Sequence, residues 1–299
     1  MRPYSPLAAG AHVALVAPAG PLSDNDLDRA VANCRTMGWE PVVGPYAEAR
    51  EDYFAGPDEL RLADFNNALH DDAVDAVWCL RGGYGAMRLL DRLEFDALKR
   101  RPKAVIGFSD ITALHAAIGL RAGLRGIHGP TARGALTPFS EESLRAATSR
   151  KDQPAGHAPN ATTLAAGRAR GRLIGGNLSL LAALHGTPFQ PSYEGAILVL
   201  EDVNEAPYRI ERMLLQLRLS GDLQKVAGIA FGQFTNPPED KSLGGARSID
   251  AVLAEAARWA GVPAIAGIPL GHVPDQWSLP LGAEAELDAD AMRLTVLTL

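Results

Sequence analysis

The sequence contains little cysteine and no paired-cysteine motif. Of its 299 residues only Cys34 and Cys79 are cysteines, and no Cys-x-x-Cys occurs. Two cysteines are too few for a disulfide framework, and the missing pair excludes the usual zinc and dithiol motifs. Cys79 lies inside the apolar run Val77–Leu80, which indicates a small core residue. We therefore expect a chain of a reducing compartment, the cytoplasm, and no metal site.

An excess of positive charge and long hydrophobic runs are also lacking. The 29 Lys and Arg residues are outnumbered by 35 Asp and Glu, which gives a formal net charge of −6. Nucleic acid is therefore not an expected partner, because phosphate neutralisation needs a basic face. No run of about 18 apolar residues occurs, so no membrane helix is predicted. The apolar region within Leu7–Gly20 is interrupted by Gly10 and His12, which favours a first buried strand over a signal peptide.

Nucleotide-binding glycine motifs are missing as well. Gly82, Gly83 and Gly85 follow a predicted strand, but their spacing is not Gly-x-Gly-x-x-Gly, and no phosphate-binding P-loop occurs. We therefore expect no cofactor. These glycines either form a tight turn or let backbone N–H groups approach a ligand, for example as oxyanion donors.

What the sequence does contain is a regular alternation of strand-length apolar runs and helix-period segments. This alternation extends from residue 12 to about 130 and is typical of a parallel sheet with crossover helices. The expected strands of this part are Val13–Ala17, Pro41–Val43, Val74–Leu80, Ala104–Gly107 and Leu124–Ile127. The fold class is therefore predicted to be α/β.

Two domains are expected from the length and from a change of pattern. Between about 135 and 168 the alternation gives way to charged, Pro- and Gly-containing sequence, with one possible helix at Glu141–Ser149. We place an N-terminal α/β domain at 1–140, a linker at 141–168 and a C-terminal β/α domain at 169–299. Antiparallel strands are expected within Ala283–Leu299.

Ser109 lies where an apolar strand stops at Gly107 and a helical pattern begins. Such a turn holds a side chain clear of the sheet, beside the free N–H groups of the helix. The serine is either a nucleophile or an ordinary helix cap, and Asp110 is able to cap the helix alone. The segment lacks the second glycine of the Gly-x-Ser-x-Gly elbow, so it is not an ordinary α/β-hydrolase signature.

A nucleophilic serine needs a base and an acid that orients it. Among the seven histidines, His272 follows a predicted strand on a Gly/Pro-rich loop, where catalytic side chains are commonly displayed. The acid should also come from a strand end, and Glu201 directly follows an apolar strand. Asp202 and Glu205 are competitors, and the spacing does not choose among the three acids.

Four sequence blocks together resemble the LD-carboxypeptidases of murein recycling. They are Arg81-Gly-Gly-Tyr-Gly85, Gly107-Phe-Ser-Asp-Ile-Thr-Ala113, Leu200-Glu-Asp-Val-Asn-Glu-Ala-Pro-Tyr-Arg209 and Gly271-His272, in the family's order over nearly the whole chain. The resemblance implies a serine peptidase whose triad is Ser109 as nucleophile, Glu201 as acid and His272 as base. It also implies a flavodoxin-like N-terminal domain, a smaller mixed β/α C-terminal domain and a site between them.

The resemblance further implies the remaining parts of the site and the substrate. The oxyanion would be bound by the N–H of Asp110 with Gly82 or Gly83, and Arg81 and Asn177 are candidates for the substrate carboxylate. The substrate would be a small peptide with a C-terminal D-amino acid, a murein tetrapeptide that loses its terminal D-alanine. The family also suggests a homodimer.

Two alternatives stay open at this stage. A relative in the same superfamily cleaves a peptide–nucleotide antibiotic and confers immunity to it. From another class, the chain would be a non-catalytic small-ligand-binding protein, in which Gly82–Gly85 holds an anion and Ser109 only caps a helix.

Overall fold

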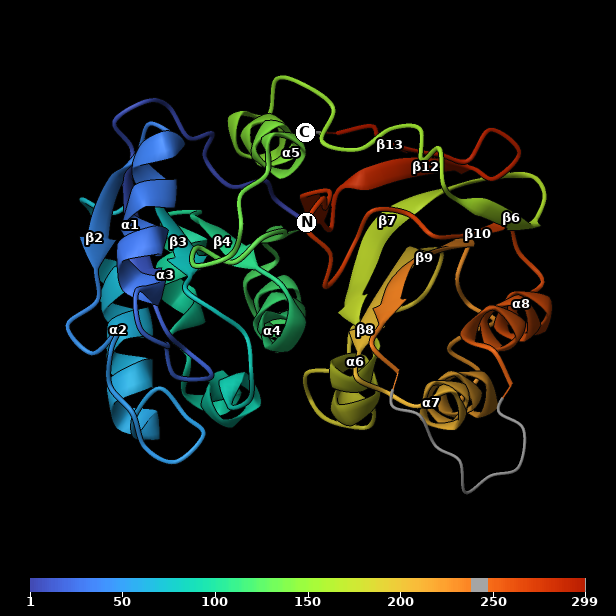
Figure 1. The fold of residues 1–299 in the computed structure, drawn as a ribbon, viewed down its shortest axis with the longest axis horizontal. Coiled ribbons are helices and arrows are strands. Elements are labelled where there is room, and N and C mark those ends of the chain that lie inside the picture. The colour runs from blue at the N-terminus through green and yellow to red at the C-terminus, as the bar shows by residue number, and fades with distance from the viewer. Residues whose placement is uncertain (238–246, 299) are drawn as a thin grey trace.

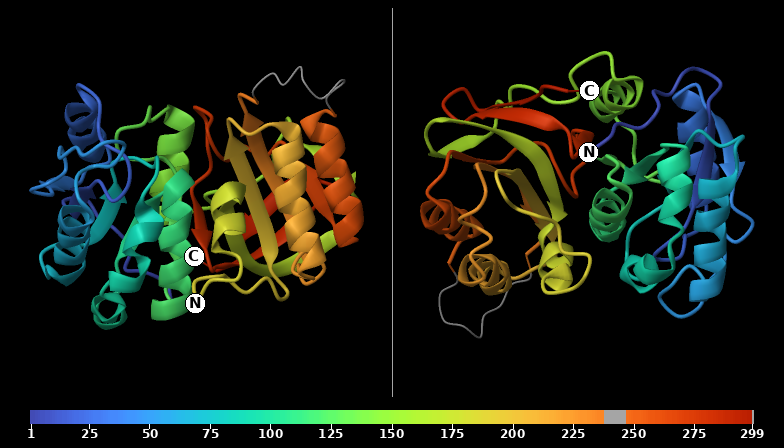
Figure 2. Two further views of the ribbon diagram at one scale, coloured as in Figure 1. Left: turned by 90° about the horizontal axis from the view of Figure 1, so that it is seen from below. Right: turned by 180° about the vertical axis from the view of Figure 1, so that it is seen from behind.

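The computed structural model of the chain describes residues 1–237 and 247–298. Its strands form two sheets that stand side by side, each with its own helices (Figure 1). Turned views keep the two sheets apart, with α4 (Thr112–Ala122) on the first sheet facing β7 (Arg168–Asn177) of the second (Figure 2). The predicted α/β class is confirmed.

The first sheet has the strand order of flavodoxin. Its parallel strands run β2-β1-β3-β4-β5, and the antiparallel β11 is added at the edge beside β5. The order 2-1-3-4-5 is the flavodoxin-like arrangement, which agrees with the expectation. The strands are β1 (His12–Val16), β2 (Glu40–Val43), β3 (Ala76–Cys79), β4 (Ala104–Gly107), β5 (Gly126–His128) and β11 (Leu279–Leu281).

Helices cover both faces of this sheet, which explains why its central strands are apolar along their whole length. All residues of β3 and β4 are buried, Cys79 among them. The helices are α1 (Asp26–Thr36), α2 (Asp58–His70), η1 (Ala86–Arg92), α3 (Phe95–Arg100), η2 (Ser109–Ile111), α4 and α5 (Pro138–Ser149). Between β4 and α4 the chain makes the single 3₁₀ turn η2, so the regular helix begins three residues after Ser109.

The second sheet is mixed and curled. Strands β7, β8, β9 and β10 are parallel, whereas β12, β13 and β6 pair antiparallel at the two ends. The strands not yet bounded are β6 (Thr162–Ala165), β8 (Ile197–Val203), β9 (Gly228–Thr235), β10 (Ala264–Ala266), β12 (Glu284–Asp288) and β13 (Arg293–Val296). One face is covered by α6 (Leu178–Leu184), α7 (Pro207–Leu219) and α8 (Ile249–Ala260) (Figure 1). The antiparallel pair expected near the C-terminus is present as β12 and β13, and Leu299 lies outside the described residues.

The segment 141–168 differs from the exposed linker that its composition predicted. Most of α5 lies within it, and Leu144 and Ala147 of this helix are fully buried in the core of the first half. β6 also falls within it and pairs with β10. The possible helix at Glu141–Ser149 is confirmed as part of α5, but the composition did not indicate that it packs into the core, because its amphipathic stripe is short and lies between polar segments. The strand β11 crosses in the other direction, since it comes from the C-terminal part of the chain and joins the first sheet.

Among residues 1–237 and 247–298, no helix combines the length and the hydrophobicity that a membrane span requires.

Candidate active site

Three loops meet at the carboxyl ends of β1, β3 and β4. In a sheet of this order, ligands bind beside the strand ends where the order reverses, between β1 and β3. Gly20, after β1, donates its N–H to the carbonyl oxygen of Gly82, after β3, at 3.0 Å. Ser109 is the second residue after the end of β4. The fold therefore gathers the glycine turn and the serine turn at the position typical of ligand sites.

Ser109 adopts a backbone conformation that is unusual for its residue type. Its φ is 65°, in the left-handed region, while Phe108 before it is extended with φ −149°. Residues other than glycine avoid this region at a cost on the order of 1 kcal/mol, and such strain concentrates at functional sites. A simple N-cap has an extended backbone, and no side-chain cap bond is present at this turn. The conformation therefore favours a nucleophile over a helix cap.

Gly82 lies so close to Ser109 that any side chain there would have to displace the serine turn. A Cβ atom at this position would lie 2.9 Å from Ser109 Cβ, 3.1 Å from Ser109 Oγ and 3.2 Å from the backbone nitrogen of Asp110. The structure thus brings together the serine hydroxyl, the Asp110 N–H and the Gly82 backbone. Gly83 follows with φ 112° and packs against Gly20. This close approach explains why glycines follow β3, although they do not form a nucleotide-binding motif.

Glu201 lies near the end of β8, where the strand is irregular. The pairing of β8 with β9 shifts register between Leu200 and Asp202, so Glu201 stands at a bulge. Bulges re-aim a side chain and are common beside active sites. The side chain of Glu201 is fully buried, and burial raises the pKa of its carboxyl group, which the neighbouring His272 partly counteracts.

His272 is the hydrogen-bond partner of Glu201. The distance between His272 Nδ1 and Glu201 Oε2 is 2.8 Å. Gly271 allows this contact, because it has φ 109° and a Cβ there would lie 2.7 Å from Glu201 Oε2. A carboxylate on Nδ1 fixes the imidazole tautomer that leaves Nε2 as a free base.

The loop that carries His272 is fastened to the first half of the chain. Ser140 Oγ donates to the carbonyl oxygen of Pro274 at 2.9 Å, and Thr137 Oγ1 donates to Asp275 Oδ1 at 2.6 Å. Both partners come from the start of α5. The His272 ring also packs against Phe108, with ring centroids 4.7 Å apart, so the histidine lies beside the residue that precedes Ser109. The composition of these segments did not predict the contacts. The one available signal was the position of Phe108, directly before the serine in the sequence.

In the part of the chain that the structure describes, no hydrogen bond joins Ser109 Oγ to His272. Hydrogen bonds of catalytic groups are often long without substrate and tighten when it binds. The tertiary structure therefore brings Glu201 and His272 together directly and puts the pair next to the Ser109 turn.

The two competing acids have other partners. Asp202 accepts hydrogen bonds from Asn177 Nδ2 at 3.0 Å and from Ser179 Oγ at 2.7 Å, which ties β8 to the start of α6. Glu205 forms a 3.7 Å ion pair with Arg209 on the surface of α7. Only Glu201, of the three acids that the spacing left open, contacts His272.

The two residues expected at the substrate carboxylate have structural partners. Asn177 caps α6, since its side-chain oxygen accepts from Leu180 N at 3.2 Å, and its amide nitrogen is bound to Asp202. Arg81 is half-buried next to Gly82 and donates from Nη1 to the carbonyl oxygen of Pro21 at 2.5 Å. Arg81 therefore keeps free N–H groups near the site, whereas both polar groups of Asn177 are used within the fold.

Asp110 combines a backbone role with a buried side chain. Its carboxylate accepts from Ala86 N at 2.7 Å, and burial raises the pKa of this carboxyl group to about 6. Because the folded-state pKa lies above the ordinary value of 3.8, the ionised carboxylate destabilises the fold above about pH 6. This effect disappears as the pH falls through 6 toward 4.

The substitution Asp110→Asn is therefore expected to stabilise the protein only at higher pH. The amide still accepts the Ala86 bond, and the gain is on the order of 3 kcal/mol at most above pH 7, shrinking to nothing near pH 4. Urea unfolding across this pH range measures it, with Asp24→Asn at an exposed carboxylate as the control. A gain that does not change with pH would contradict the assignment.

The described residues contain no group of three His, Cys, Asp or Glu side chains arranged to hold a metal ion. What the arrangement is equipped for is acyl transfer: a strained serine, backbone N–H groups beside it and a carboxylate-bound imidazole close by.

Comparison with known proteins agrees with this chemistry. Models of the LD-carboxypeptidase N-terminal and C-terminal domains match residues 13–129 and 170–287. A murein tetrapeptide carboxypeptidase of Pseudomonas aeruginosa is 38% identical, over 94% of this chain and 94% of that protein. The crystal structure of a muramoyltetrapeptide carboxypeptidase from Oxalobacter formigenes has 32% identity and a TM-score of 0.82, covering 95% of this chain and 97% of the other.

The microcin C7 self-immunity protein MccF of Escherichia coli is a more distant relative. It is 26% identical, over 98% of this chain and 94% of that protein, and its structure with glutamyl sulfamoyl guanosine superposes with a TM-score of 0.89. The matches to both domain models and the identity to carboxypeptidases along nearly the whole length lead to one conclusion: the chain belongs to the LD-carboxypeptidase family.

Proposed function

We propose that the protein is a serine carboxypeptidase that removes the terminal D-alanine from murein tetrapeptides. The observation that carries the proposal is the left-handed Ser109 turn, with the hydrogen-bonded pair of buried Glu201 and half-buried His272 packed beside it through Phe108. The substrate class comes from the relatives, since a murein tetrapeptide carboxypeptidase is 38% identical and MccF is 26% identical. We place its action in the cytoplasm, as a dimer, on the basis of the family resemblance.

The mechanism follows from the roles of the residues. His272 Nε2 takes the proton of Ser109, and Ser109 Oγ attacks the carbonyl carbon of the L,D-peptide bond. The oxyanion accepts hydrogen bonds from the Asp110 N–H and from a backbone N–H of Gly82 or Gly83. The imidazolium then protonates the leaving D-alanine amine, and water activated by the same imidazole hydrolyses the acyl-enzyme. Glu201 stabilises the imidazolium throughout.

Arg81 is the candidate that the structure favours for the carboxylate of the D-alanine. It adjoins Gly82 and retains guanidinium N–H groups that are not committed to Pro21. Planar guanidinium groups bind carboxylates in a two-pronged arrangement, which would fix the end of the peptide.

Two assays test the proposal and its alternatives. Incubation with a murein tetrapeptide is expected to release D-alanine, whereas hydrolysis of a peptidyl sulfamoyl adenosine instead would favour an immunity-type activity like that of MccF. A serine-reactive fluorophosphonate is expected to label Ser109, and the labelled peptide identifies the residue by mass spectrometry. No turnover of either substrate together with no labelling would favour the non-catalytic ligand-binding alternative.

The close contact between Gly82 and Ser109 yields a separate prediction. Gly82→Ala is expected to lower kcat/KM by about 10²–10³, because the methyl group would displace the serine turn and the oxyanion N–H groups. Gly156→Ala is the control, since a Cβ there meets no atom within 4 Å. Full activity of Gly82→Ala in the D-alanine assay would remove Gly82 from the site.

A further inference from the structure

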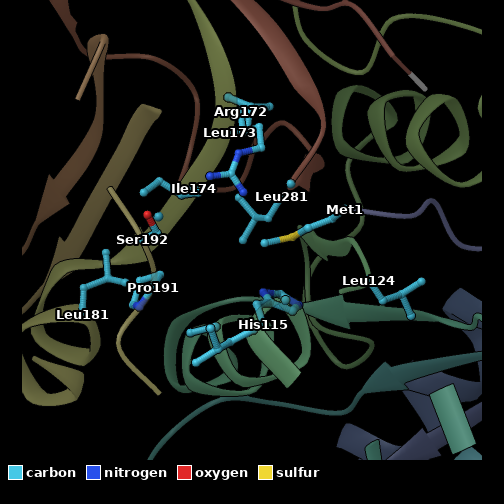
Figure 3. A pocket seen from close by; sticks show the side chains of 15 residues that line it. Met1, His115, Leu124, Arg172, Leu173, Ile174, Leu181, Pro191, Ser192 and Leu281 are labelled. Carbon is cyan, nitrogen blue, oxygen red and sulfur yellow. The ribbon is translucent and has the colours of Figure 1, made fainter. Parts of the chain in front are cut away.

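A hollow lies between the two halves of the chain, and none of the active-site residues lines it. It has a volume of about 190 Å³ and is bounded by α4, β7, β11 and the segment 191–192. Figure 3 shows Arg172 of β7, Leu281 of β11 and His115 of α4 arranged around the same space. The residues come from parts of the chain far apart in sequence, so only the packing of the two halves forms this hollow.

The walls of the hollow are mainly apolar. Met1 and Leu120 face it from the first half, and Leu181 and Ile174 face it from the second (Figure 3). A cavity of about 150 Å³ lined by such side chains is large enough for benzene. The size therefore suits one compact apolar group, an aromatic ring or a branched aliphatic chain.

A cation without a partner stands at one side of this apolar space. Arg168 and Arg170, on the same strand, lie within 2.8 Å and 3.7 Å of Asp288 and Glu286. Arg172 is half-buried and has no ion pair or hydrogen bond within the described residues, although Glu284 is its register partner on β12. A partly desolvated guanidinium next to apolar walls is suited to the carboxylate of a ligand whose body fills the space.

His115 forms part of the wall, and it is buried. The side chain is 4% exposed, and its Nε2 lies 3.2 Å from the carbonyl oxygen of Val105. Burial lowers the pKa of this imidazole to about 4, so the ring is neutral near pH 7 and Nε2 carries the proton. Nδ1 is buried without a hydrogen-bond partner and is closed to solvent, so His115 forms a neutral part of the wall and offers no hydrogen bond to a ligand.

We propose that the hollow between α4 and β7 is a binding site for a small monocarboxylate with a compact apolar body. The carboxylate binds Arg172, and the apolar body lies between Leu120, Leu181 and Met1. Carboxylic acids with an aromatic or branched aliphatic side chain have this chemistry. The proposal does not depend on the catalytic assignment, because no residue of the candidate active site takes part.

Titration calorimetry with 3-phenyllactate tests the site directly. Saturable binding with a Kd of about 1 mM or below is expected, and the methyl ester, which lacks the charge, is expected to bind at least tenfold more weakly. Arg172→Gln is expected to weaken binding about tenfold, whereas Arg170→Gln, two residues away on the same strand, leaves it unchanged. Equal affinity of these two variants would overturn the proposal.

A cavity-filling variant separates this site from the catalytic one. Ala116 lines the hollow on α4, and Ala116→Phe is expected to abolish binding while D-alanine release persists. If Ala116→Phe fails to fold by circular dichroism, the pair of arginine variants still decides. Unchanged affinity in a folded Ala116→Phe protein, or no saturable binding to the wild type up to 10 mM, would overturn the proposal. The proposal would also be overturned if self-association of the protein displaced the ligand, because a second copy of the chain would then occupy the hollow.

Discussion

Ser109→Ala is expected to lower kcat/KM for D-alanine release by about 10⁴ or more while the protein stays folded. Removal of the nucleophile leaves only the oxyanion donors and substrate binding, which sustain a small residual rate. A D-alanine assay that compares wild type and variant at equal protein concentration measures the effect. Cooperative unfolding in urea confirms that the variant is folded. Activity within tenfold of the wild type would end the assignment of Ser109.

The same position offers a test of the strained turn. Ser109→Gly is expected to be as inactive as Ser109→Ala, but equally stable or up to about 1 kcal/mol more stable. Glycine relieves the left-handed conformation, and its larger entropy in the unfolded chain offsets part of this gain. Urea unfolding compares the two variants. If the glycine variant were less stable than the alanine variant by more than about 1 kcal/mol, the turn would not be strained.

Glu201→Gln is the second substitution with a large expected effect, a fall in kcat/KM of about 10³–10⁴. The amide has nearly the shape of the carboxylate, so the hydrogen bond to His272 Nδ1 is able to persist. An amide nitrogen facing Nδ1 would, however, favour the opposite tautomer and leave Nε2 protonated, and a neutral amide would not stabilise the imidazolium. The loss should therefore appear in kcat, with KM little changed.

The matched control is Glu205→Gln, which removes a carboxylate four residues away on the same segment. Glu205 is paired with Arg209 and does not contact His272, so its loss should change activity only a few-fold. Similar losses in both variants would mean that the local negative charge matters, rather than the orientation of the imidazole.

Much of the fold was predictable from local pattern. The apolar strand-length runs and the helix-period segments between them indicated a parallel α/β sheet, and β3 and β4 are fully buried as such runs require. The helix α7 begins at Pro207, as expected, because proline is suited to the first helical turn. Such features depend on residues that are neighbours in the sequence, and the sequence alone therefore predicts them.

The linker shows where local pattern is insufficient. Residues 141–168 are polar and contain Pro and Gly, yet α5 packs Leu144 and Ala147 into the core, and its first turn holds the loop of His272. Likewise, β11 joins the first sheet although it lies beyond residue 270. Which surface a short amphipathic helix or a three-residue strand meets depends on distant partners, and that information is not periodic in the sequence.

The sequence by itself determined the residue types and the order of the chemistry: a serine on a strand-to-helix turn, glycines after the preceding strand, acids at a strand end and a histidine on a Gly/Pro loop. It left Glu201, Asp202 and Glu205 equivalent, and family resemblance alone preferred the first. Only the tertiary structure decided which acid contacts His272, because the bulge in β8 buries one carboxylate and Gly271 lets the imidazole approach it. The conformation of Ser109 likewise depends on packing, since the fold must supply the energy that holds a serine in the left-handed region.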